Sequence, residues 1–154
     1  MTAGQPHAVR VRDADCEPLK DAVVDVWHCD AGGVYSGFGN ATSNRTFMRG
    51  LQRTNAKGVA VFRTVYPGWY PGRTVHIHVK VHVKGNVVHT GQLFFPAATS
   101  QAVYARAPYN AHGSTPDTSN AQDSIYRNGG KRSQVKVRKN AGLYVASITM
   151  GVTR

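Results

Sequence analysis

The most regular pattern in this chain is an alternation of apolar and polar residues with a period of two, rich in Val, Ile and Thr. Such alternation is typical of β-strands, because successive side chains of a strand point to opposite faces. Gly, Pro and Asn bound the stretches, which lie at residues 8–12, 22–28, 58–65, 74–83, 87–95, 134–138 and 143–149. The pattern predicts an all-β fold, a single-domain β-sandwich of about seven to eight short strands with long loops.

Little of the chain predicts helix. No segment carries a sustained apolar stripe at helical spacing, and only residues 97–106 are compatible with one or two helical turns. Residues 108–120 are rich in Gly, Pro, Ser, Thr and Asn, which is typical of a long surface loop. The chain shows no repeat and no linker, so we expect residues 1–154 to form one domain.

The chain is strongly basic, with 19 Lys and Arg against 8 Asp and Glu and a formal net charge of +11. Such an excess attracts polyanions or acidic small molecules. The basic residues are scattered, however, and no nucleic-acid-binding motif accompanies them. No apolar run approaches the ~20 residues of a membrane span, and the first residues lack the apolar centre of a signal peptide. We therefore expect neither nucleic acid nor a membrane as partner.

Two cysteines, Cys16 and Cys29, leave two interpretations open. As a disulfide they would close a loop of about 14 residues and add on the order of 3 kcal/mol to stability. As buried free thiols they would simply pack. Two cysteines alone do not decide between these states.

The segment 74–83 contains two histidines at a spacing that suits a metal ion. His76 and His78 are two positions apart, so in a strand they project from the same face, about 6.6 to 6.8 Å apart. Two imidazoles so placed can converge on one ion. A solvated or hydrogen-bonded strand face is the alternative. His82 follows on the same face and His89 lies across the next turn, so a count of histidines does not single out ligands.

Tyrosines lie in turns close to this segment. Tyr66 and Tyr70 occur in a Pro- and Gly-rich turn just before the histidines, and Tyr35 follows a Gly-rich turn after the segment 22–28. A buried tyrosine is usually a core residue with a hydrogen-bonded hydroxyl. A metal-bound phenolate is rarer, because a bound cation must lower a phenol pKa of about 10.

These stretches together resemble the intradiol ring-cleavage dioxygenases, the family of catechol and protocatechuate dioxygenases, and within it the secreted actinobacterial branch. The resemblance runs over nearly the whole chain, from about residue 9 to its end. It is carried by DVWHCDAGGVYSGF (25–38), YPGWYPGRTVHIHV (66–79) and TGQLFF (90–95), with NAQDSIYRNGG (120–130) and ITMGV (148–152) typical of that branch.

The resemblance implies a set of metal ligands. In this family Fe(III) is held by two tyrosines and two histidines, which correspond here to Tyr35, Tyr70, His76 and His78. The family's turn after a Phe-Arg-Thr strand points to Tyr70 rather than Tyr66 as the second tyrosine. Phenolate oxygens and imidazoles suit a hard trivalent ion better than a zinc–thiolate or Cu(I) site would.

The resemblance also implies an activity. A catechol would bind the iron through both oxygens, displace Tyr35, which takes a proton, and react with dioxygen to give a cis,cis-muconate. Arg73 matches the family's active-site arginine and would stabilise developing negative charge, and Gln92 matches a glutamine beside the site. The implied partners are catechols and dioxygen; a homo-oligomer and a carbohydrate-binding domain removed from this chain are compatible with this resemblance.

Further implications concern location and the pocket. The secreted branch favours a disulfide between Cys16 and Cys29 and an extracellular location. Two departures from the family pattern also matter. Only five residues separate Tyr70 from His76, and the family's N-terminal segment, with its Thr-Glu-Gly-Pro-Tyr-Tyr-like motif, is absent from this chain. Both departures predict a more open pocket.

Two other functions compete with this one. A zinc or copper enzyme would use His76, His78 and a further histidine such as His82, but it leaves Tyr35 and Tyr70 without a role. A non-catalytic transthyretin-like β-sandwich binding module would explain the strands around residues 16–26, yet it does not need two tyrosines and two histidines together.

Overall fold

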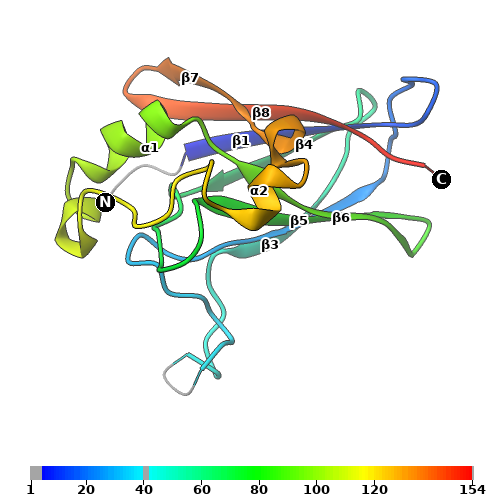
Figure 1. Ribbon diagram of the computed structural model, residues 1–154. Coiled ribbons are helices and arrows are strands. Elements are labelled where there is room, and N and C mark those ends of the chain that lie inside the picture. The colour runs from blue at the N-terminus through cyan, green and yellow to red at the C-terminus, as the bar shows by residue number, and fades with distance from the viewer. Residues whose placement is uncertain (1–4, 40–41, 154) are drawn as a thin grey trace.

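The computed structural model describes residues 5–39 and 42–153, and it folds as two stacked antiparallel-rich sheets with short helices at one end and one edge (Figure 1). One sheet has the order β4-β1-β8-β7 and the other β3-β2-β5-β6. The strands are β1 (Gln5–Arg12), β2 (Val23–Trp27), β3 (Arg49–Arg53), β4 (Val59–Thr64), β5 (His76–Val83), β6 (Asn86–Phe94), β7 (Lys136–Asn140) and β8 (Leu143–Gly151). The predicted all-β sandwich is confirmed.

The core lies between the sheets and follows the period-two pattern. Alternate residues of each inner strand face inwards, because successive side chains of a pleated strand point to opposite faces. On β5 the buried set is Ile77, Val79 and Val81, which are at most 3% exposed, and on β2 it is Val24 and Val26. These apolar side chains fix the register of β5, and a one-residue slip would bury its polar face instead. The core therefore dictates which β5 residues face outwards.

The pattern missed one strand and placed another imprecisely. The edge strand β3, of sequence RGLQR, has no alternating apolar residues and is mostly exposed, so nothing in its composition marks it as a strand. It forms because β2 offers an unpaired edge, with Val23 paired to Arg53 and Trp27 to Arg49. β7 begins at Lys136, two residues later than expected, because a 3₁₀ helix, η2 (Gly130–Ser133), precedes it.

Helical segments cover the end of the sandwich where β5 begins. The expected helical turns at 97–106 form α1 (Ala97–Tyr104). The expected loop at 108–120 holds a 3₁₀ helix, η1 (Tyr109–His112), and a short helix, α2 (Ser124–Arg127), follows it. No helix of the described part is long and apolar enough to cross a membrane.

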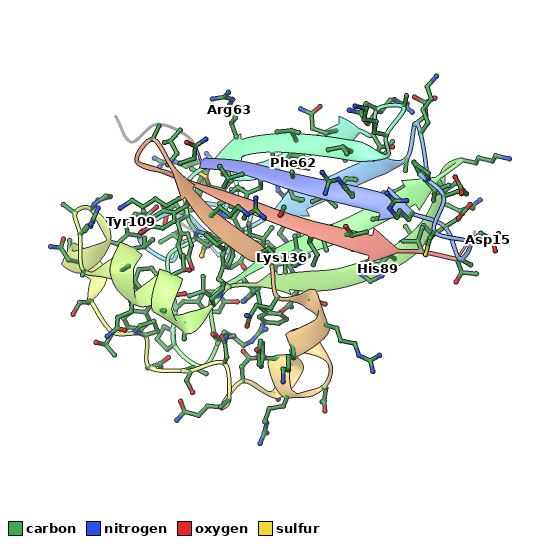
Figure 2. All side chains as sticks on the ribbon, turned by 90° about the horizontal axis from the view of Figure 1, so that it is seen from above. Asp15, Phe62, Arg63, His89, Tyr109 and Lys136 are labelled. Atoms are coloured by element: carbon green, nitrogen blue, oxygen red, sulfur yellow. The ribbon has the colours of Figure 1, made fainter. Side chains whose placement is uncertain are left out.

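The disulfide that the resemblance favours does not form. Cys16 is exposed in the turn between β1 and β2, and Cys29 is a buried free thiol whose sulfur donates a hydrogen bond to the Gly68 carbonyl at 3.2 Å. Asp15, beside Cys16, lies at one end of the molecule, far from Tyr109 at the other (Figure 2). The five residues of β2 separate the cysteines by roughly 17 Å, whereas a disulfide needs Cα atoms within about 7 Å.

Candidate functional site

Two imidazoles project from the outer face of the β3-β2-β5-β6 sheet at the start of β5. His76 and His78 lie on the face opposite the buried Ile77 and Val79, with ring centroids 4.9 Å apart and planes at 80°. The alternation of the strand predicted this arrangement. His76 is only 1% exposed, whereas His78 is partly exposed beside the open face of the sheet. The pair therefore sits at a boundary between the protein interior and solvent.

The orientation of His76 is set by the backbone just before it. Its Nδ1 lies 2.7 Å from the Thr74 carbonyl oxygen, which can only accept, so Nδ1 carries the proton. The Nε2 atom is then a bare acceptor. It faces the hydroxyls of Tyr35 at 3.3 Å and Tyr70 at 3.1 Å. Nδ1 bonded to a carbonyl, with Nε2 left free, is the arrangement that metal-binding histidines commonly show.

His78 is held by stacking. Its ring lies parallel to the indole of Trp27, with centroids 4.8 Å apart and planes at 3°. The two residues are directly paired across β2 and β5, so the sheet register fixes the stack. The ring of Tyr35 approaches the edge of His78, with centroids 5.9 Å apart. Four aromatic side chains, from Tyr35, Tyr70, His76 and His78, thus surround one small space.

The two tyrosines reach this space from interlocking glycine turns. The Gly68 N–H donates to the Asp30 carbonyl at 2.8 Å, which ties the turn before Tyr70 to the turn before Tyr35. A Cβ atom at Gly68 would lie 2.6 Å from the Asp30 carbonyl oxygen, and one at Gly33 would lie 2.2 Å from the Trp69 carbonyl oxygen. Side chains at these two positions would force the turns apart. The glycines therefore let both phenols reach His76.

Burial shifts the pKa values of the four side chains in the directions that favour their neutral forms. It lowers the pKa of His76 to about 4, against the opposing effect of the Thr74 carbonyl, and the charge of Arg73 acts with it. It also lowers the pKa of His78 to about 4, again with Arg73 contributing. Burial raises the pKa of both Tyr35 and Tyr70 above the ordinary value. Near neutral pH the imidazoles are thus free to act as ligands, and a phenolate would need a nearby cation.

Arg73 lies in the short segment between Tyr70 and the start of β5, and two side chains hold it in place. Its Nε donates to Asp123 Oδ2 at 2.8 Å, and its Nη2 donates to Gln92 Oε1 at 2.5 Å. Gln92 is paired with His78 across β5 and β6, so its side chain emerges beside the imidazole. The structure therefore gathers Arg73 and Gln92 next to the four aromatic groups, as expected from the resemblance.

Asp123 anchors this arrangement, and the sequence reasoning did not single it out. Its side chain is fully buried, and Oδ2 accepts hydrogen bonds from Arg73 and from the Thr74 N–H at 3.0 Å. Its Oδ1 accepts from the N–H groups of Ile125 and Tyr126, both at 2.9 Å, as an N-cap of α2. Burial alone would raise the pKa of Asp123, but the hydrogen bonds from Tyr126, Arg73 and Thr74 outweigh it and leave the pKa below its ordinary value.

Two signals for these missed residues exist in the sequence. An Asp immediately before a short helical turn is a common N-cap, and Asp123 stands there in a chain that has few acidic residues. Trp27 is the other missed residue, and its alternation on β2 places it on the outer face with the imidazoles. Neither signal reveals the partner, because Arg73 and Asp123 are 50 residues apart along the chain.

Other histidines and tyrosines do not join the site. Tyr66 is 2% exposed and its hydroxyl bonds Ser100 Oγ at 2.8 Å, so it belongs to the core rather than to the space around His76. His82 lies six positions beyond His76 on β5, which corresponds to roughly 20 Å. Within residues 5–39 and 42–153 no group of three or more His, Cys, Asp or Glu side chains could hold a metal ion. The zinc or copper site built on His82 is therefore wrong.

Comparisons with known proteins identify relatives of this sequence and fold. The family model described as "Dioxygenase" matches residues 6–103. An intradiol ring-cleavage dioxygenase from Tetranychus urticae has a solved structure with a TM-score of 0.92 and 32% identity, covering 99% of this chain and 82% of that one. The dioxygenase domain of a dioxygenase carbohydrate-binding protein fusion from Streptomyces sp. SirexAA-E gives a TM-score of 0.68 and 31% identity, covering 96% and 79%.

Curated relatives match over a shorter stretch. A chlorocatechol 1,2-dioxygenase from Rhodococcus opacus is 28% identical in an alignment over 104 residues, and the match covers 55% of this chain and 40% of the relative. A relative of the same description from Cupriavidus pinatubonensis is 29% identical over 103 residues, with the same coverage. The match therefore spans less than half the length of these curated relatives.

Proposed function

Because this chain belongs to the intradiol ring-cleavage dioxygenase family, we propose that it opens catechol-type rings between the two hydroxylated carbons, using dioxygen and a non-haem Fe(III) ion. The observation that carries the proposal is the convergence of two phenols on a bare imidazole nitrogen, at 3.1 and 3.3 Å, with a second imidazole alongside. A transthyretin-like binding module has no use for this convergence.

The donor set fits the proposed ion. With only two histidines and no nearby Cys, Asp or Glu cluster in the described part of the chain, any ion here must be shared with the phenols. Phenolate oxygen and imidazole nitrogen together suit a hard trivalent cation. Tyr35, Tyr70, His76 and His78 would hold it. When bound, such an ion would act as a Lewis acid towards both oxygens of a catechol and prepare the ring for dioxygen.

The chain's own side chains supply the remaining steps. The phenolate oxygen of Tyr35 would accept a proton from one catechol hydroxyl and become the neutral phenol. The guanidinium of Arg73 would stabilise the negative charge that develops on the substrate, a preorganised role that its bonds to Asp123 and Gln92 support. Trp27, stacked on His78, keeps that imidazole in one orientation.

The substrate range follows from what covers the site. Pro71 to Val75 are the only residues between Tyr70 and His76, and none of the five is a bulky apolar residue that could form a lid. This segment would make few contacts with small substituents at the remote positions of the ring, and discrimination between such substrates depends on such contacts. We therefore expect catechol, several substituted catechols and hydroxyquinol to be cleaved with comparable kcat/KM.

Spectroscopy and kinetics test this function directly. Loading the protein with Fe(III) should give the red-brown absorption of phenolate-to-iron charge transfer, and zinc should give none. The loaded protein should consume one dioxygen per catechol and release a muconate, whereas phenol should not react because it lacks the second oxygen. A coloured protein that leaves catechol intact would refute the activity, and a colourless one would refute the site.

The extracellular location rests on the resemblance alone, because the two cysteines are free thiols and form no disulfide.

A further inference from the structure

A separate cleft of about 510 Å³ opens on the outer face of the β3-β2-β5-β6 sheet. Its position follows from the sheet register, which pairs Trp27 with Arg49 and pairs Asp25 with both Leu51 and Lys80. Paired residues on neighbouring strands project from the same face. Phe38, from the segment after Tyr35, completes the lining, which consists chiefly of Asp25, Trp27, Phe38, Arg49, Leu51 and Lys80.

The cleft shares two of its walls with the proposed iron site. Trp27 is stacked on His78, with centroids 4.8 Å apart. Phe38 meets the ring of Tyr35 edge to face, with centroids 5.8 Å apart. A ring chelated between the tyrosines and histidines would therefore have the cleft directly beside it. Any substituent long enough to leave the chelation site on that side would enter the cleft.

The lining combines exposed apolar surface with an excess of positive charge, two cations to one carboxylate. Phe38 is 61% exposed and Leu51 62%, so two large apolar side chains face solvent next to a partly exposed indole. Arg49 and Lys80 form no ion pair within 4.0 Å in the described part of the chain, and Lys80 Nζ instead lies 5.7 Å from the Trp27 ring centroid. Two cations stand against the single carboxylate of Asp25.

We infer that this cleft binds the distal arm of a catechol extended by a flat, unsaturated or aromatic group that ends in an anion. The arm would lie against Trp27 and Phe38, since aromatic faces favour flat unsaturated groups, and its anionic end would meet Lys80 and Arg49. His78 and Lys80 are two positions apart on β5, about 6.6 to 6.8 Å, which matches a three-carbon arm with a terminal carboxylate. The inference rests on the proposed function and names the substrate class of that site.

The experiment compares three substrates: catechol, 3,4-dihydroxycinnamate and its methyl ester. In the wild type, kcat/KM should be higher for the acid than for the ester. An exposed charge pair changes affinity by roughly two- to fivefold. Arg49→Gln with Lys80→Gln should therefore reduce the ratio of the acid's kcat/KM to that of catechol by about tenfold, mainly through KM. Phe38→Ala should reduce the ratios for acid and ester alike, by about threefold.

Arg53→Gln is the matched control, because Arg53 is an exposed cation on the same strand as Arg49 but does not line the cleft. It should leave the ratio of acid to catechol unchanged. An equal loss with Arg53→Gln would show that overall surface charge, and not the cleft, favours the acid, and it would overturn the inference. A ratio that is insensitive to Arg49 and Lys80 would overturn it as well.

A binding measurement separates this inference from the proposed function. The probe 3,4-dimethoxycinnamate cannot chelate a metal, because both catechol oxygens are methylated. Calorimetry should show that it binds the wild type, and that binding weakens about tenfold in the variant carrying both Arg49→Gln and Lys80→Gln. Binding of the probe without turnover of catechol would refute the activity and leave the cleft standing. Turnover of catechol without binding of the probe would refute the role of the cleft and leave the proposed activity standing.

Discussion

Two regions of this molecule contain tyrosines in close contact, and they differ in what the hydroxyls meet. In the core, Tyr66, Tyr104 and Tyr109 pack edge to face, and the hydroxyls of Tyr104 and Tyr109 donate to backbone carbonyls at 2.9 Å. In the site, Tyr35 and Tyr70 pack equally closely, with centroids 5.7 Å apart, yet their hydroxyls point at an imidazole nitrogen. A backbone carbonyl can only accept a hydrogen bond, whereas a bare imidazole nitrogen can also bind a metal ion.

The buried histidines His28 and His76 show the same difference between the core and the site. The Nδ1 atom of His28 contacts the Cys29 carbonyl at 2.6 Å and that of His76 contacts the Thr74 carbonyl at 2.7 Å. The other nitrogen of His28 bonds the Thr64 hydroxyl at 2.8 Å, so its hydrogen-bonding capacity is used within the protein. The core tyrosines and His28 thus each have a protein partner of their own. In the site the polar atoms of Tyr35, Tyr70 and His76 face one another, as the proposed ligand set requires.

The largest effect is expected from removing a donor of the site. His76→Ala or Tyr70→Phe should abolish iron binding and colour and reduce turnover by at least about three orders of magnitude, as loss of a catalytic group does. Metal analysis and the visible spectrum give the readout. His89→Ala is the control and should keep both, because His89 is paired with Val81, five positions beyond His76 on β5. Retention of iron by His76→Ala would contradict the ligand set.

The second-largest effect is expected from Arg73, and it separates binding of the ion from catalysis. Arg73→Ala should keep iron and colour but reduce kcat by about a hundredfold or more, because the guanidinium is needed where negative charge develops. The variant should also be less stable, since it leaves the buried carboxylate of Asp123 without its cation. Arg63→Ala, which removes an exposed arginine from β4, is the matched control. Unchanged turnover in Arg73→Ala would remove Arg73 from the mechanism.

A smaller effect concerns the histidine of the core. Burial lowers the pKa of His28 to about 4, against the Cys29 carbonyl and Asp30, while the unfolded chain titrates near 6.5. Between these values the unfolded chain binds a proton that the folded one does not. This stability is therefore complete above pH 6.5 and is lost as the pH falls towards 4.

The slope of the free energy of unfolding against pH measures the contribution of His28. Each such histidine should change the free energy of unfolding by about 1.4 kcal/mol per pH unit in that window. Urea unfolding of the metal-free protein at several pH values should show a slope that is shallower by this amount in His28→Gln. Equal slopes for the variant and the wild type would mean that His28 already titrates normally in the fold.

The smallest effect is expected from the core tyrosine Tyr66, and it concerns stability only. Tyr66→Phe removes the hydroxyl that bonds Ser100 in the core, and it should cost about 1 to 2 kcal/mol of stability. Iron content, colour and kcat should be those of the wild type. If Tyr66→Phe bleached the protein and Tyr70→Phe did not, the assignment of the two tyrosines in this turn would be reversed.

The sequence predicted the features that depend on local periodicity. The alternation in β5 places His76 and His78 on one face without reference to the rest of the chain. Features set by pairing between distant segments could not be found in this way. The strand β3 exists because β2 has a free edge, and the separation of Cys16 from Cys29 follows from the direction of β2. The anchoring of Arg73 by Asp123 has the same origin, because it joins segments that only the folded sandwich brings together.

The segment 117–123 contacts three successive residues, 72–74, of the short segment between Tyr70 and β5. Asp117 accepts from the Gly72 N–H at 3.2 Å, Asn120 Oδ1 accepts from the Thr74 hydroxyl at 2.5 Å, and Asp123 holds Arg73. All four proposed donors lie at or before residue 78, within the stretch 6–103 that the family model matches, whereas this segment lies outside it. The segment would therefore act on the proposed reaction by holding Arg73 and Thr74 in place, while it supplies none of the proposed donors itself.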